Sequence, residues 1–258
     1  MDRFHPAALR VILLLILLCF TLLATGCGVD FTAPKPVKSD PDILAGTWNG
    51  TLEDPAGTGN VSAMTINFND FGQITSIVSG GVDWNVNGIV EGVAGESRLF
   101  LIHLTDGAGN LIEAGFYTGG AFKHAGYMDE NLNVAVVEKN GQLPPAGFVD
   151  SDLWGTTVAR IINIDAGFNI TGSSTSNVTV FTDNTIEGDD TSVGPFTGSL
   201  NIASATLGLA TGTYVAAGAG ISNGLLAAII SPDKSFVGSY TCSPTVAFGN
   251  CGFRVWNY

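Results

Sequence analysis

Residues 66–75 have the sequence Ile66-Asn67-Phe68-Asn69-Asp70-Phe71-Gly72-Gln73-Ile74-Thr75, which predicts a β-hairpin. Polar and apolar residues alternate over residues 63–68, as in a strand with one buried face. The four residues from Asn69 to Gly72 are turn formers, because Asn, Asp and Gly tolerate the backbone conformations of tight turns. Residues 73–78 then continue as a second strand, so the segment predicts two antiparallel strands joined by a short turn.

The same pattern recurs without gaps in Ile162-Asn163-Ile164-Asp165-Ala166-Gly167-Phe168-Asn169-Ile170-Thr171. Weaker echoes relate Trp48 to Trp154, Tyr117 to Tyr214, and the segment 128–131 to the segment 230–234. Their common spacing of about 100 residues suggests two similar units, the alternative being chance similarity among β-forming sequences. We therefore expect a first β unit at 44–139, a linker at 140–150 and a second β unit at 151–258.

Composition supports an all-β fold. Charged residues make up 13% of the chain while glycine numbers 34, and long helical patterns are absent after residue 27. Further strands are predicted at 98–105, 111–117, 213–217, 225–230 and 236–241. Short strands at this spacing, joined by hairpin turns, indicate an antiparallel barrel or sandwich in each unit. A helix at 221–230 is the alternative there, but Gly224 counts against it.

The predicted first strand opens with Gly46-Thr47-Trp48, which resembles the opening of lipocalins and avidins. In those families a tryptophan closes one end of an up-and-down β-barrel, so the resemblance implies a barrel for the first unit. Trp154 matches the pattern less well, because its glycine follows rather than precedes it. No ligand-contacting residue carries over from the resemblance.

The first 26 residues have the layout of a secretory signal. Arg3 and Arg10 provide a basic start, residues 11–20 are almost entirely apolar, and small residues precede Cys27. A transmembrane helix is the alternative reading of residues 11–24, but spanning a bilayer takes about 20 apolar residues. Residues 28–43 follow as a proline-containing tether that would hold the folded part away from the membrane.

The sequence Leu23-Ala24-Thr25-Gly26-Cys27 resembles the lipobox of bacterial lipoproteins. The resemblance implies that the Cys27 thiol is acylated, for example with palmitate, and becomes the mature N-terminus. Because Gly28 rather than Asp follows the cysteine, it also implies the outer membrane more than the inner membrane. The expected location is therefore the cell envelope, with the chain anchored through its N-terminal lipid.

The charge balance limits the partners. The chain has 10 basic and 23 acidic residues, a formal net charge of −13. Nucleic acid is therefore excluded as an expected partner, since phosphates are bound by Lys and Arg. Electrostatic attachment to anionic lipid is disfavoured for the same reason.

Two cysteines, Cys242 and Cys251, remain beside Cys27 and the Cys19 of the signal segment. In an oxidising compartment they are expected to form a disulfide across the final hairpin. The alternative is a pair of free thiols in a metal site, but no neighbouring Cys or His supports one.

Other candidates for chemistry are weak. His103 and His124 lack a nucleophile motif, so each is expected to be an ordinary strand residue. Glu187, Asp189 and Asp190 are candidates for binding calcium, as is Asp106 with Asn110, but both groups also suit turns. No phosphate loop, haem attachment motif or zinc cluster is found, so no cofactor and no metal are expected.

These observations predict a membrane-anchored envelope lipoprotein that is not an enzyme and that serves as a structural or interaction module. Its partner would be an envelope protein. The alternative is a carrier that binds a small apolar ligand inside a barrel, although a small barrel is often filled by its own side chains. An envelope hydrolase is the least favoured reading.

Overall fold

The computed structural model describes residues 39–53, 61–131, 133–141, 147–164, 170–191, 194–242 and 252–257. All of them belong to one compact unit, Val37–Tyr258. The chain is all-β, as predicted, with seventeen strands in these ranges and three short 3-10 helices at Pro41–Leu44, Asp150–Asp152 and Ala217–Ala219. The predicted signal segment, Cys27 and Cys251 lie outside the described residues.

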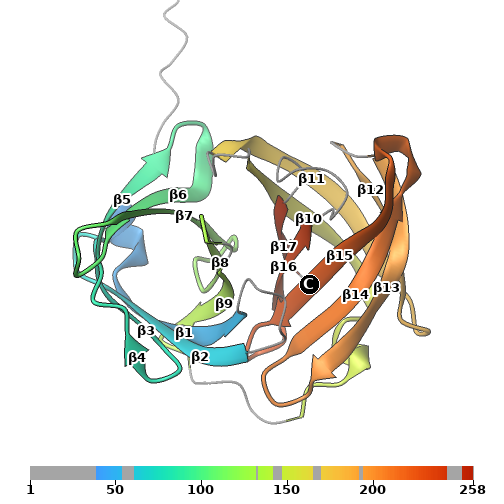
Figure 1. The fold of residues 1–258 in the computed structure, drawn as a ribbon, viewed down its shortest axis with the longest axis horizontal. Coiled ribbons are helices and arrows are strands. Elements are labelled where there is room, and N and C mark those ends of the chain that lie inside the picture. The colour runs from blue at the N-terminus through green and yellow to red at the C-terminus, as the bar shows by residue number, and fades with distance from the viewer. Residues whose placement is uncertain are drawn as a thin grey trace, which may run out of the picture. The chain divides into compact units, whose positions relative to one another are not determined.

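The first barrel is built from nine strands, β1 to β9. Eight of them close into an antiparallel ring in the order β1-β2-β3-β5-β6-β7-β8-β9, because β9 pairs back with β1, and β4 pairs only with β3 (Figure 1). Their bounds are β1 (Gly46–Glu53), β2 (Val61–Phe68), β3 (Ile74–Ser79), β4 (Val82–Asp83), β5 (Asn87–Val93), β6 (Glu96–Thr105), β7 (Leu111–Thr118), β8 (His124–Asp129) and β9 (Val134–Lys139).

The second barrel has eight strands in plain chain order and closes where β17 pairs with β10. Its strands are β10 (Gly155–Ile164), β11 (Ile170–Val180), β12 (Thr185–Asp190), β13 (Gly194–Ser204), β14 (Leu209–Ala216), β15 (Ile221–Ile230), β16 (Phe236–Cys242) and β17 (Gly252–Asn257). Residues 221–230 therefore form a strand and not a helix. Each unit is a closed barrel rather than a sandwich.

Asn and Asp side chains fix the hairpin turns of the first barrel. The side-chain oxygens of Asn69, Asp106 and Asp129 each accept hydrogen bonds from the backbone N–H groups two and four residues later. These bonds close the turns without help from other segments, which is why such residues favour turns. The turns predicted at 69–72 and 106–110 are thus confirmed.

Side chains fill the interior of the first barrel. The Trp48 side chain is fully buried, donates its indole N–H to the Leu44 carbonyl at 2.8 Å, and contacts the rings of Phe68 and Phe116 edge to face. Apolar side chains from all eight ring strands complete this cluster. The second barrel has its own buried cluster, which includes Trp256. The interior cores account for the alternation of buried and exposed residues in strands such as β5, whereas β8 and β9 are buried on both faces.

The repeat is displaced by one strand between the two barrels. Residues 66–75 join the second and third strands of the first ring, whereas 162–171 begin in the first strand of the second ring and reach into its second. Tyr117 and Tyr214 show the same offset, on the sixth and fifth strands. The matched residues also differ in the face they occupy, since Ile66 and Tyr214 belong to the barrel interiors whereas Ile162 and Tyr117 lie outside them. The chain therefore forms two barrels, as expected, but the matched segments do not occupy equivalent positions in them.

The expected match between Trp48 and Trp154 is also not found in the structure. Trp154 lies just before β10 and is 38% exposed, so it does not repeat the buried Trp48. Strand β17, which pairs with β10, carries the buried Trp256 of the second barrel, but Trp256 pairs in register with Ala159 whereas Trp48 pairs with Ile66, so the two tryptophans do not hold matched positions of the repeat. Trp256 is buried like Trp48.

Candidate functional site

A third apolar cluster lies between the two barrels, built from side chains that point away from both barrel interiors. Strands β8 and β9 of the first barrel lie against β15, β16 and β17 of the second. The buried members are Leu99, Tyr117, Met128, Val134 and Val136 from the first barrel and Ile162, Leu209, Ala227, Ile229, Phe236 and Val255 from the second. This junction cluster joins the barrels through an apolar interface, which fixes the polar side chains around it.

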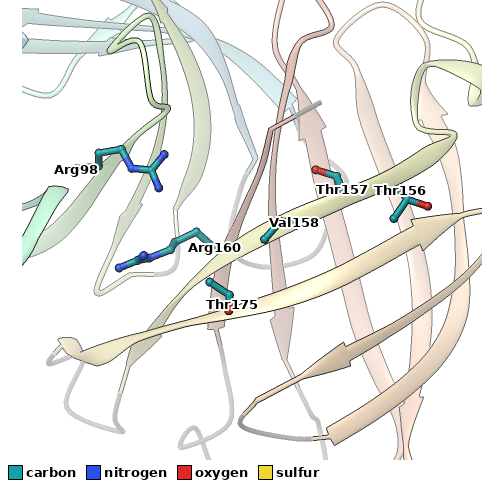
Figure 2. A pocket seen from close by; sticks show the side chains of 6 residues that line it. All are labelled: Arg98, Thr156, Thr157, Val158, Arg160 and Thr175. Atoms are coloured by element: carbon teal, nitrogen blue, oxygen red, sulfur yellow. The ribbon is translucent and has the colours of Figure 1, made fainter.

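A groove of about 390 Å³ opens beside the junction cluster (Figure 2). Strand β6 contributes Arg98, and strands β10 and β11 contribute the rest. Its lining residues are Arg98, Thr156, Thr157, Val158, Arg160 and Thr175. Arg160 is paired in register with Thr175 across β10 and β11, so a guanidinium and a hydroxyl-bearing residue stand next to each other.

The two arginines of the groove have unequal partners. The Arg160 guanidinium forms an ion pair with Glu96 and donates to the Ser173 hydroxyl at 2.7 Å, and Ser173 in turn donates to Glu96 at 2.6 Å. Among the described residues, Arg98 has no carboxylate partner. Its guanidinium lies 5.3 Å from the centre of the Tyr117 ring, and that of Arg160 lies 6.0 Å from it.

Two buried polar atoms near these arginines have no partner in hydrogen-bonding geometry. They are the Tyr117 hydroxyl and Nε of Arg160. Burial raises the pKa of Tyr117, and the charge of the Arg98 guanidinium together with its contact with the hydroxyl oxygen opposes that rise, so Tyr117 stays neutral at ordinary pH. Because buried polar groups are normally paired, these atoms mark a place where hydrogen-bonding capacity is unused.

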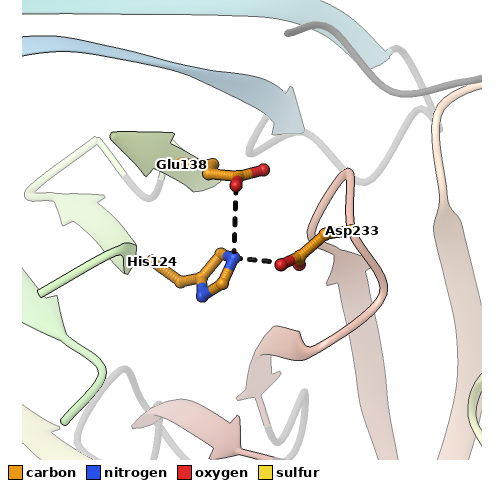
Figure 3. A group of neighbouring side chains, drawn as sticks. All are labelled: His124, Glu138 and Asp233. Carbon is orange, nitrogen blue, oxygen red and sulfur yellow. Dashed lines mark ion pairs between the residues drawn. The ribbon is translucent and has the colours of Figure 1, made fainter. Parts of the chain in front are cut away.

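A polar cluster forms the second feature of the junction (Figure 3). His124 of β8 and Glu138 of β9 face Asp233, which lies in the turn between β15 and β16. The His124 Nε2 atom is 2.9 Å from Asp233 and 3.7 Å from Glu138. Lys123 Nζ lies 3.0 Å from each of the two carboxylates. The imidazole also stacks on Phe236 of the second barrel at 5.8 Å.

Burial and charge act in opposite directions on this cluster. Burial lowers the pKa of His124 from its usual 6.5, although the charges of Asp233 and Glu138 oppose that fall. We take burial to dominate, since the imidazole is packed against Phe236 and largely removed from water. Burial works to raise the pKa of Asp233, but hydrogen bonds from Ser235, Lys123 and Ser231 outweigh it and leave that pKa far below 3.8. At neutral pH the imidazole of His124 is therefore neutral, and the Asp233 carboxylate and the Lys123 ammonium are charged.

The geometry of the cluster does not activate a nucleophile. The Ser235 hydroxyl lies 3.4 Å from His124 Nδ1 and 3.3 Å from Nε2, so it faces neither nitrogen along its lone pair. It donates instead to Asp233 at 2.7 Å. A catalytic serine needs the imidazole, rather than the carboxylate, to take its proton.

His124, Glu138 and Asp233 are also the one group of three His, Cys, Asp or Glu ligand atoms brought together among the described residues, all lying within 4.8 Å of one another. The ammonium of Lys123 already bridges the two carboxylates, where it supplies the positive charge that a metal ion would otherwise bring. We therefore read the cluster as an ionic contact between the barrels.

The structure spreads the other predicted residues apart. The Nδ1 atom of His103 lies 2.6 Å from a carboxylate oxygen of its cross-strand neighbour Glu113 on the outside of the first barrel. Glu187 and Asp189 are exposed on β12, whereas Asp190 is buried, so the three calcium candidates do not share one face. Cys242 ends β16, and its predicted disulfide partner lies outside the described residues.

The groove and the cluster were not found from the sequence as sites. Arg98 and Arg160 are 62 positions apart, and each stands alone in a strand sequence. The only available signal was compositional: of the three arginines after the predicted signal segment, two line the groove. Nothing in the sequence relates His124 to Asp233, which lies in the second barrel.

Comparisons with known proteins assign the chain to no family. No family model matches it, and no curated protein matches it in sequence. Among solved structures, it is similar to a protein of unknown function from the DUF3598 family of Nostoc punctiforme, at 11% identity and a TM-score of 0.40, over 86% of this chain and 99% of that one. It is also similar to the isotype 1 transferrin binding protein B of serogroup B Neisseria meningitidis, at 8% identity and a TM-score of 0.29, over 76% of this chain and 62% of that one.

At these identities and TM-scores the likenesses assign no function to the chain. Within the described ranges, no helix is both long enough and apolar enough to cross a membrane.

Proposed function

We propose that the chain is a lipid-anchored protein of the bacterial cell envelope that acts as a non-enzymatic interaction module. The signal-like segment and the lipobox resemblance at Cys27 support the anchor. The outer membrane is the proposed location, following the identity of Gly28. Two joined barrels would then be held away from the lipid by the tether at 28–43.

The observation that carries the interaction role is the packing of both barrels. Their largest interior side chains, such as Trp48, Phe116 and Trp256, are at most 1% exposed and in contact with one another or with neighbouring apolar groups. Close-packed interiors favour binding at outer surfaces over a ligand held inside a barrel. The polar cluster at His124 supports a non-enzymatic role, because its groups satisfy one another.

The anchor is tested by expressing the wild-type chain and a Cys27→Ser variant in a bacterial host and measuring the mass and membrane fraction of each. We expect an acyl-modified N-terminus at residue 27 in the wild type and none in the variant. Cys19→Ser is the matched control, because Cys19 lies in the segment that would be removed. A mature wild-type chain that begins elsewhere without lipid would refute the anchor.

The interaction role is separated from the carrier alternative by native mass spectrometry of the purified protein. The proposal predicts the mass of the processed chain and its lipid. A constant additional mass of a small apolar molecule, released only on unfolding, would instead favour a carrier.

A further inference from the structure

We propose that the groove lined by Arg98, Arg160 and Thr175 binds a singly charged oxyanion, such as a carboxylate or a phosphodiester, carried on a small hydroxylated molecule. This inference deepens the proposed function, since it names the ligand chemistry for a module that binds rather than catalyses. The site lies at the barrel junction and outside both barrel interiors.

Charge is the first argument. The chain is strongly acidic, yet two of its few arginines meet at one groove. Glu96 pairs with Arg160, so one positive charge, that of Arg98, is left without a counter-charge among the described residues. Guanidinium groups bind carboxylates and phosphates through parallel N–H bonds. The charge that remains matches one negative charge on the ligand.

The donors available at the groove are the second argument. The Tyr117 ring lies within 5.3 Å of the Arg98 guanidinium and 6.0 Å of the Arg160 guanidinium, so one buried aromatic ring holds both cations close together. The Tyr117 hydroxyl and Nε of Arg160 are closed to solvent, so the contacts with a ligand in the groove fall to the exposed N–H groups of the two guanidinium groups. Those groups are donors only, and they pair with an acceptor. An oxyanion supplies acceptor oxygens and no donors of its own.

The remaining lining residues define what the anion is attached to. Thr156 and Thr175 contribute exposed hydroxyl-bearing side chains, of which the Thr156 hydroxyl is hydrogen-bonded to that of Thr179 at 3.0 Å. Thr157 is only 5% exposed, and Val158 contributes a small apolar surface that is 57% exposed. Hydroxyl groups both donate and accept, so they suit a sugar or glycerol unit. A volume of about 390 Å³ is at the small end of ligand sites, and it fits one such unit rather than a long chain.

The groove is also held in a fixed shape. Its walls come from both barrels, which the junction cluster packs together, and Arg160 is held by Glu96 and Ser173. A preformed site avoids part of the entropy cost of binding. The ion pair therefore positions Arg160, while the Arg98 side chain is left to contact the ligand.

The test is isothermal titration calorimetry on residues 28–258, which contain every residue of both barrel cores. The probes are glucuronate, for a carboxylate on a sugar, dimethyl phosphate, for a soluble phosphodiester, and phosphatidylglycerol vesicles, for a lipid-borne phosphodiester. Phosphatidylcholine vesicles are the uncharged control. We expect saturable binding of at least one probe with one site per chain, and the probe that binds identifies the source of the anion.

Three variants locate the binding. Arg98→Ala should weaken it at least about tenfold, because a hydrogen bond to a charged group is lost. Thr175→Val, which keeps the shape, should weaken it about two- to tenfold. Lys139→Gln removes a positive charge that does not line the groove and should leave the affinity within about twofold, since a charge outside the site is screened by salt.

No saturable binding of any probe, or equal affinity in wild type and a folded Arg98→Ala variant, would overturn the proposal. Because the protein used in this test has neither signal nor lipid, its result is independent of the anchor. A failed lipidation test would refute the anchor and leave the groove untouched.

Discussion

The junction cluster makes the stability of the protein sensitive to one side chain on the outside of the second barrel. Phe236 is 0% exposed, belongs to the junction cluster, and stacks on His124 of the first barrel. Phe236→Ala removes the ring and leaves a cavity that neither barrel can easily fill. Truncations of buried Phe to Ala cost about 3–5 kcal/mol. For a unit of this size, that loss corresponds to a fall in Tm of about 6–20 °C.

The assay is urea unfolding of residues 28–258, followed by tryptophan fluorescence and by circular dichroism. Phe71→Ala is the matched control, because the Phe71 ring is 76% exposed in a turn and its loss should change the free energy of unfolding by less than about 0.5 kcal/mol. A loss below about 1 kcal/mol for Phe236→Ala would refute the reasoning, since it would mean that the barrels do not pack through this ring.

Three further predictions concern pH, close packing and the C-terminal cysteines. Because burial lowers the pKa of folded His124 below 6.5, the unfolded chain takes up the proton first as pH falls, and the free energy of unfolding decreases below about pH 6.5. His124→Gln should make the free energy of unfolding less dependent on pH between pH 7 and pH 5. An unchanged slope would contradict this. A Cβ at Gly212 would collide with the Ser199 carbonyl oxygen, so Gly212→Ala should separate β13 from β14 and lower the free energy of unfolding in urea by at least about 1–3 kcal/mol. Gly120→Ala is the control and should lower it far less, because the nearest atom to a Cβ at Gly120 is 3.7 Å away. Cys242 and Cys251 are predicted to resist thiol labelling in the exported, denatured and non-reduced protein, and free labelling of both would exclude the disulfide.

Local sequence patterns predicted the strands and turns well, because a hairpin depends on neighbours in the chain. Residues 66–75 gave the end of β2, its turn and the start of β3 from alternation and turn formers alone. The strand at 221–230 was likewise favoured over a helix by Gly224, and the structure confirms it.

The order of strands around each ring could not be deduced in the same way. Closure depends on pairing between distant strands, such as β9 with β1 and β17 with β10, and no local pattern records that pairing. Two units are therefore visible in the sequence, but the strands and faces that the matched segments occupy are not. The sequence match of Trp154 with Trp48 does not hold in the fold, where Trp48 is buried and Trp154 is 38% exposed.

The groove at Arg98 and Arg160 could not be predicted from the sequence for a related reason. The groove forms only because the outer faces of β6, β10 and β11 meet at the junction, and outward-facing residues in a barrel look like ordinary solvated positions. Arg98 and Arg160 form a candidate site only because the packing of the barrels brings both guanidinium groups next to the buried Tyr117 ring.

The central claim is that the protein binds at the junction of two solid barrels and not inside either of them. The most direct test is a ¹H–¹⁵N NMR titration of residues 28–258 with whichever of glucuronate and dimethyl phosphate binds more tightly. We predict that the shifted resonances concentrate on Arg98, Arg160 and Thr175, including the arginine side-chain Nε–H signals. Shifts that concentrate instead on interior residues, with the indole signals of Trp48 and Trp256 moving most, would contradict the claim and favour a carrier.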